Sequence, residues 1–139
     1  MQLSPQKIPQ IHIVGVGGFG MSAIARVLMQ QGYRISGSDL RVNDFTIALT
    51  EAGARIAQGH AAENISGAGL VAASSAVPDD NPELVAAREA GIPVMRRRDL
   101  LGALLAQEIG VGFAGTHGKT TTTALMVHVF HCAKMNPSY

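Results

Sequence analysis

Residues 11–25 read IHIVGVGGFGMSAIA, and they predict a strand, a glycine turn and a helix in succession. The apolar run 11–14 is typical of a buried strand. Beyond the glycines, apolar residues recur at helical spacing: Met21, Ile24, Ala25 and Leu28. A strand that enters a helix through a tight glycine turn is how an α/β fold begins.

The following hundred residues repeat this alternation of strand and helix. Further strands are predicted at 33–37, 55–57, 70–74 and 92–95. Between them, helices are predicted to begin at Asn43 or Asp44, at Asn81-Pro82-Glu83, and at Asp99. We therefore expect a doubly wound, Rossmann-like parallel sheet of about five strands, with the shortest strand, 92–95, at an edge.

The composition bounds the class of protein. The chain has 139 residues, of which 47% are hydrophobic and only 4% aromatic, so we expect about one domain with an aliphatic core. A formal net charge of +1 argues against a nucleic-acid surface. The single cysteine, Cys132, excludes an internal disulfide, and is predicted to be a buried helical residue in a reducing compartment. No stretch approaches the ~18 apolar residues of a membrane span, so we expect a cytoplasmic protein without a membrane partner.

The first glycine turn is a candidate diphosphate site. Gly15, Gly17 and Gly20 form G-x-G-x-x-G between a strand and a helix, and Asp39 closes the second strand. This is the dinucleotide fingerprint in its proper context. Close helix–strand packing without a ligand is the alternative. Any nucleoside diphosphate conjugate fits the turn as well as NAD does. Asp39 can accept from a ribose hydroxyl, accept from a base N–H, or cap the following turn.

A second glycine turn lies at residues 114–123, AGTHGKTTTT, after a predicted strand at 109–114. Its backbone N–H groups and the helix that follows favour an anion. Lys119 can reach terminal phosphates, and Thr120 offers a hydroxyl to Mg²⁺. The strict phosphate-loop pattern requires glycine where the chain has Phe113, so the match is to the shorter variant Gly-Thr-x-Gly-Lys-Thr. A solvated turn is the alternative.

Two phosphate-binding turns in one chain favour transfer chemistry between ATP and a nucleotide-carried substrate. Two other classes of protein compete with this interpretation. An NAD-dependent oxidoreductase or redox-sensing module would need only the first turn and Asp39. The other is a nucleotide-binding regulator without enzymatic activity.

Five motifs in order resemble the amino-terminal part of the Mur ligases of peptidoglycan synthesis and cell-wall biogenesis: IHIVGVGGFGMSAIA, SGSDL, ASSAVPDDNPEL, GIPVMRRRDLL and GTHGKTTTT. The resemblance covers nearly the whole chain, from about residue 11 to residue 139. Within the family, the motifs are most similar to those of members that join L-alanine to UDP-N-acetylmuramate. Members that attach a recycled tripeptide share GTHGKTTT, but usually carry cysteine in the first turn where this chain has glycine.

The resemblance implies an ATP-dependent ligase of three domains. The carboxylate of UDP-N-acetylmuramate attacks ATP, and L-alanine then attacks the acyl phosphate to give an amide, ADP and phosphate. Residues 1–108 would be the UDP-sugar-binding domain and residues 109–139 the incomplete start of the ATP-binding domain. The chain therefore resembles a truncated ligase, which we expect to be inactive alone.

The resemblance also assigns residues to the two sites. Lys119 would be catalytic, because it neutralises charge on the transferred phosphate, and Thr120 would hold Mg²⁺. The ATP site would comprise Gly115, Thr116, His117, Gly118, Lys119, Thr120 and Thr121. The UDP-sugar site would comprise Gly15, Gly17, Gly18, Phe19, Gly20, Met21, Ser38, Asp39, His60, Ser74, Ser75 and Ala76.

Several of these residues can instead have an ordinary structural or surface role. His117 can face solvent without a role. Ser74 and Ser75 can cap the strand end rather than contact sugar or diphosphate. His60, with Asn64, can belong to a surface loop, and the run Arg96-Arg97-Arg98 can be a solvated face unless one arginine meets a phosphate.

The terminal segment 109–139 carries an apolar helical face with no evident cover. Leu125, Val129 and Cys132 lie on it at helical spacing. Exposed apolar patches of this size rarely persist. We expect the segment either to be poorly ordered or to pack against a second copy of the chain as a dimer.

Overall fold

The chain divides into two compact units, Met1–Gln107 and Glu108–Tyr139. The structure is a computed structural model, and it describes residues 3–8, 10–106, 110–135 and 137.

The first unit is built on a five-stranded sheet whose pairings are all parallel. In space the strands run in the order β3 (Arg55–Gln58), β2 (Arg34–Asp39), β1 (Gln10–Val14), β4 (Leu70–Ala73) and β5 (Val94–Arg96). The predicted doubly wound sheet is confirmed, with the shortest strand at an edge. Val14 lies opposite both Ser38 and Ala73, so the carboxyl ends of the three central strands line up.

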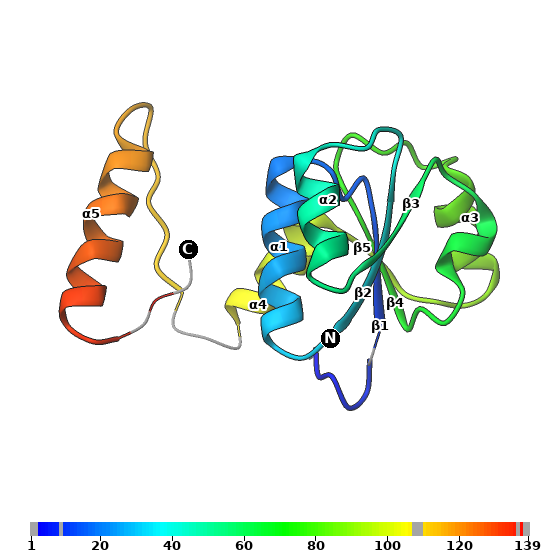
Figure 1. Ribbon diagram of the computed structural model, residues 1–139, viewed down its shortest axis with the longest axis horizontal. Coiled ribbons are helices and arrows are strands. Elements are labelled where there is room, and N and C mark those ends of the chain that lie inside the picture. Colours follow the sequence, from blue (N-terminus) through cyan, green and yellow to red (C-terminus); the bar gives the residue numbers. More distant parts are fainter. Residues whose placement is uncertain (1–2, 9, 107–109, 136, 138–139) are drawn as a thin grey trace. The chain divides into compact units, whose positions relative to one another are not determined.

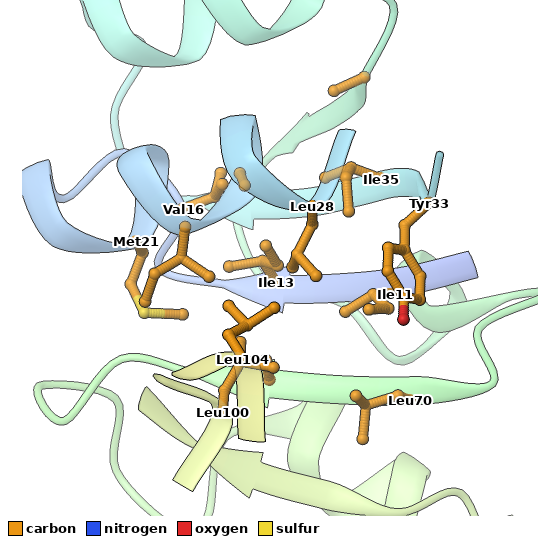
Figure 2. Close-up of a cluster of buried hydrophobic side chains, with 14 of the residues drawn as sticks. Ile11, Ile13, Val16, Met21, Leu28, Tyr33, Ile35, Leu70, Leu100 and Leu104 are labelled. Carbon is orange, nitrogen blue, oxygen red and sulfur yellow. The ribbon is translucent and has the colours of Figure 1, made fainter. Parts of the chain in front are cut away.

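Helices cover both faces of this sheet (Figure 1). On one face lie α1 (Phe19–Gln30), α2 (Asp44–Glu51) and α4 (Arg97–Leu105), and on the other lie α3 (Pro82–Glu89) and the short 3₁₀ turn η1 (Ala62–Ile65). Figure 2 shows the larger core, where Ile11 and Ile13 of β1 meet Leu28 of α1. Period-2 alternation then turns His12 to the α3 face.

Local signals explain where the helices begin. Asn43 caps α2, because its side chain accepts from Thr46 N while the Thr46 hydroxyl accepts from Asn43 N. Asn81 caps α3, and Pro82 occupies the first turn. The last helix of this unit, α4, begins at Arg97, two residues before the predicted start at Asp99. No side chain caps it, and the extended Arg96 marks the boundary instead.

The second unit holds one helix, α5 (Lys119–Cys132), in its described part. Residues 110–114, where a strand was expected, form none, because a strand requires a paired neighbour and no described segment supplies one. No residue of α5 is buried. The prediction that Cys132 is buried is therefore wrong, since its thiol is exposed. Across the described residues, no helix is both long and apolar enough to cross a bilayer.

Candidate functional site

The first glycine turn is fixed to the end of β2. The N–H groups of Gly15 and Val16 both donate to Ser38 O, at 2.8 and 3.1 Å. Gly15 has a φ of +75°, which glycine adopts without strain. A Cβ at Gly15 would lie 3.1 Å from Ser74 Cβ, so the segment after β4 packs directly against the turn. The turn therefore sits at the carboxyl edge of the central strands.

Asp39 holds the middle of this turn. Its Oδ2 accepts from Gly17 N at 2.8 Å, and its Oδ1 accepts from Arg41 N at 3.2 Å. Asn43 Nδ2 donates to Gly17 O at 3.0 Å. In this state the carboxylate supports the glycine turn and caps the residues that follow it. Capping of the following turn was one of the three roles predicted for Asp39.

The start of α1 presents unpaired backbone donors. Gly18 is the N-cap, with no side-chain cap, and the N–H groups of Phe19 and Gly20 donate to no acceptor among the described residues. The positive end of the helix dipole lies at the same place. Phe19 is 78% exposed there and meets Phe45 edge to face, with ring centroids 6.0 Å apart. These donors can bind an anion such as a diphosphate.

Arg97 places a cation beside these donors. A Cβ at Gly20 would fall 2.5 Å from Arg97 Cζ, so the guanidinium lies against the Cα of Gly20. A side chain at position 20 would displace the guanidinium from this place. Within the described residues, no carboxylate forms an ion pair with Arg97, and its charge adds to the positive potential at the start of α1.

Glu83, a buried carboxylate on α3, contacts several polar side chains at the same edge of the sheet. It accepts from Ser38 Oγ at 2.6 Å and from Asn64 Nδ2 at 2.6 Å. His60 Nδ1 lies 3.1 Å from its Oε2, and His12 Nε2 lies 3.7 Å from its Oε1. Burial raises the pKa of the Glu83 carboxyl, but interactions with His12, Ser38 and Asn64 outweigh burial and lower the pKa to about 2. Glu83 is therefore an ionised acceptor inside the fold.

The segment after β4 is held by charged hydrogen bonds. Arg96 donates to Ser74 O, Val77 O and Asp79, and Arg88 donates to the backbone and side chain of Asp79. Hydrogen bonds from Arg96 and then Arg88 lower the pKa of the Asp79 carboxyl. Ser74 Oγ accepts weakly from Ala76 N at 3.4 Å, while Ser75 and Ala76 are exposed. The strand-end capping that was the alternative for Ser74 is thus present in this state.

The second glycine turn lies in the other unit. Gly118, with a φ of +80°, is the N-cap of α5. Lys119 Nζ folds back over the turn and donates to Gly115 O at 2.6 Å and Thr116 O at 3.3 Å. Thr116, His117, Thr120 and Thr121 are exposed. The described residues contain no group of three or more His, Cys, Asp or Glu side chains placed to hold a metal.

The structure brings most of the predicted UDP-sugar residues to one edge. The glycine turn, Ser38, Asp39, His60 and residues 74–76 all lie at the carboxyl ends of the strands. Met21 is instead buried in the core, 2% exposed, so it contributes packing behind the turn. Beside Asp39, a cavity of about 320 Å³ opens between α2 and β3, lined by Val42, Ile47 and Ile56 among others.

Sequence reasoning missed two residues that support this edge, His12 and Glu83, and it did not single out Arg97 from its neighbours. Glu83 was interpreted only as an acid near a helix start. One available signal was His12, which is the single polar residue within the apolar run 11–14. For Arg97 the charge run was noted, but nothing in the run distinguished it from its two neighbours.

Comparisons with known proteins agree with one another. A profile of the Mur ligase family, catalytic domain, matches residues 10–109. The UDP-N-acetylmuramate–L-alanine ligase of Acidithiobacillus ferrooxidans is 50% identical over 132 residues, which make up 95% of this chain and 28% of that relative. The chain therefore spans about 28% of the length of such curated relatives.

Solved structures show the same fold. The UDP-N-acetylmuramate-alanine ligase of Thermotoga maritima superimposes with a TM-score of 0.81 at 39% identity, over 90% of this chain and 30% of that one. A murein peptide ligase from Psychrobacter arcticus gives a TM-score of 0.82 at 26% identity, over 90% of this chain and 27% of that one.

Proposed function

The chain belongs to the Mur ligase family, and from this membership we propose that it is the nucleotide-sugar-binding part of a ligase that joins L-alanine to UDP-N-acetylmuramate. Residues 1–108 would bind the UDP-sugar, and residues 109–139 would begin the ATP-binding domain. Because ATP would be a substrate, we propose the cytoplasm as the compartment of this protein.

One structural observation carries the nucleotide-binding part of this proposal: the unpaired N–H groups of Phe19 and Gly20 at the carboxyl edge of the sheet. A diphosphate accepts hydrogen bonds from such donors, and the helix dipole favours its charge. Arg97 adds a cation at the same place. Gly18 has no side chain, so a diphosphate could approach the backbone closely there. Asp39 and the cavity beside it lie where a nucleoside attached to that diphosphate would extend.

The second turn supports the ATP half of the proposal. Lys119 would exchange its two carbonyl partners, Gly115 O and Thr116 O, for phosphate oxygens and neutralise charge in the transition state. The N–H groups of residues 115–121 would cradle the phosphates, with His117 within the same turn. Thr120 would give one hydroxyl ligand to Mg²⁺. Bound Mg²⁺ would offset the negative charge of the triphosphate.

The proposed reaction activates a carboxylate as an acyl phosphate before the amine attacks, because a carboxylate is a poor electrophile. The chain spans about 28% of the length of its curated relatives, and its described residues contain no group of three or more His, Cys, Asp or Glu side chains placed to hold a metal. We therefore expect the 139-residue chain to bind the UDP-sugar but to form no amide by itself.

A related activity, the attachment of a peptide to the same sugar nucleotide, is the second candidate. The fold of the murein peptide ligase supports it equally well, since its TM-score matches that of the alanine ligase. The identity of 50% to an alanine ligase against 26% to the peptide ligase favours the first candidate.

Calorimetric titration of the chain with UDP-N-acetylmuramate, NAD and ATP in parallel tests the proposal. We expect saturable binding of the UDP-sugar, weak binding of ATP and none of NAD. Thermal melting gives an independent check. A melting temperature that rises with NAD but not with millimolar UDP-sugar would instead support a dehydrogenase-like module.

A further inference from the structure

Glu83 joins four separate segments behind the proposed nucleotide site. It is fully buried on α3, and its carboxylate contacts β1 through His12, β2 through Ser38, and the stretch after β3 through His60 and Asn64. Among the described residues, no lysine or arginine forms an ion pair with it. Its hydrogen bonds therefore come from polar side chains whose proton positions it can dictate.

The contacts of His60 determine where its ring proton lies. Ser38 Oγ has a single proton, and that proton is donated to Glu83 at 2.6 Å. The two neighbours of His60 Nδ1, Ser38 Oγ at 3.0 Å and Glu83 Oε2 at 3.1 Å, are then both acceptors. His60 Nδ1 must carry the proton, so Nε2 of the neutral ring is left as an acceptor.

The same carboxylate imposes the opposite tautomer on His12. Its Nε2 forms no hydrogen bond with the described residues, but it faces Glu83 Oε1 at 3.7 Å, and the negative carboxylate favours the proton on Nε2. Nδ1 then accepts from Ser36 Oγ at 3.0 Å. His12 is 1% exposed and is internal to the fold, whereas the ring of His60 is 16% exposed. Of the two rings, His60 alone can present its free nitrogen to a ligand.

His60 stands at the nucleoside end of the proposed site. The preceding residue, Gly59, donates its N–H to Asp39 O at 2.8 Å, and Ser38 O holds the glycine turn. In dinucleotide-binding folds the acid at this strand end lies beside the ribose. The exposed edge of the His60 ring is therefore close to the groups that a bound nucleoside would bring.

We propose that Glu83 is a positioning residue that holds His60 Nε2 as a hydrogen-bond acceptor for a donor of the nucleoside, either a base N–H or a ribose hydroxyl. This inference rests on the proposed function. It selects uracil, whose N3 carries a proton, over cytosine, whose N3 does not, if the base is the partner. It selects the ribose over its deoxy forms if the sugar is the partner.

Nitrogen-15 NMR of the histidine rings in the ligand-free chain tests the proposed positions of the ring protons. We expect His60 protonated on Nδ1 and His12 protonated on Nε2 at neutral pH. In Glu83→Gln the side-chain amide can donate as well as accept, so His60 should become a mixture of tautomers. Glu89→Gln, at the exposed far end of the same helix, is the matched control and should leave both rings unchanged.

Binding of UDP tests the proposed hydrogen bond between the nucleoside and His60. We expect His60→Ala and Glu83→Gln each to weaken UDP binding about tenfold, the effect of one lost hydrogen bond. Glu83→Gln should have no further effect in the His60→Ala background, whereas a merely structural role would weaken binding in both backgrounds. The 3-methyluridine, 2′-deoxyuridine and 3′-deoxyuridine diphosphates then identify the donor, because the analogue that lacks it should bind parent and His60→Ala equally.

The possible failures are distinct. His60 protonated on Nε2 in the parent, or all three analogues binding like UDP, overturns the role of Glu83, and the first of these needs no variant to fold. A parent chain that shows the expected tautomers but binds no UDP overturns the proposed function, and with it the nucleoside as the partner of His60.

Discussion

At the scale of single residues, close backbone contacts at glycine limit what the fold tolerates. Gly37 lies in the middle of β2, and a Cβ there would fall 2.8 Å from Ile13 O and 3.1 Å from Val16 Cβ. Both neighbours belong to the central strand and its turn, so neither can move without disturbing the sheet. We expect Gly37→Ala to lower the free energy of unfolding by ~1–3 kcal/mol in urea titrations.

Gly102→Ala is the control for this change. Gly102 lies in α4, and a methyl group on its Cα would meet no atom within 4 Å beyond the adjacent residues and the helix backbone, so alanine should stabilise the chain by ~0.5–1 kcal/mol. Equal effects of the two substitutions would contradict the packing described for Gly37.

Gly17 has a similar constraint that bears on ligand binding. A Cβ there would lie 2.9 Å from Asp39 Oδ2 and 3.0 Å from Asn43 Nδ2. Gly17→Val should push both side chains away and fill the approach of the diphosphate. We expect UDP-sugar binding to fall by more than about tenfold, with a smaller loss of melting temperature. Parent-like affinity in Gly17→Val would show that the diphosphate does not sit at this turn.

The buried Glu83 predicts a pH dependence of stability. Its folded pKa of about 2 lies below the ordinary value of 4.5, so its contribution is complete above about pH 4.5 and is lost as the pH falls towards 2. The contribution is on the order of 3 kcal/mol. The difference in unfolding free energy between parent and Glu83→Gln should shrink over that window. The lowered pKa of Asp79 acts in both proteins and cancels, and a constant difference would contradict the assignment.

At the scale of elements, sequence patterns predicted the sheet to within one or two residues at each strand end. Apolar runs bounded by glycine, with caps at Asn43 and Asn81, carry that information locally. The segment 110–114 was not predictable in the same way, because a strand exists only through its neighbour. The glycine turn and Asp39 were placed by their fingerprint. Glu83 was not, because its partners lie on distant elements and no local pattern records them.

Asn43 links one element to the site. It caps α2 through Thr46 N and also donates to Gly17 O, so two substitutions can separate these roles. Asn43→Ala removes both and should destabilise the chain by ~1–2 kcal/mol. Asn43→Ser keeps a cap but loses the bond to Gly17 O. We expect near-parent stability by urea unfolding, with weaker UDP binding, and equal destabilisation by both would show that the cap is not what Asn43 supplies.

At the scale of the whole molecule, the two units differ in how well they are covered. The first has a buried core on both faces of its sheet, whereas α5 buries no residue and exposes Leu125 by 63% and Val129 by 53%. We expect the 139-residue chain to self-associate through 109–139, and a chain ending at residue 108 to be monomeric. Light scattering at several concentrations measures both. A strictly monomeric long chain, with α5 amides protected in hydrogen exchange, would contradict this expectation.

The exposed thiol of Cys132 is a natural site for chemical labelling. It is the single cysteine of the chain, and it projects from the last turn of α5. A maleimide dye will therefore attach at one known position without any engineered substitution. Its fluorescence anisotropy reports whether the second unit tumbles with the first or independently, before and after UDP-sugar is added. The same thiol can cross-link two chains in air, so self-association must be measured under a reductant.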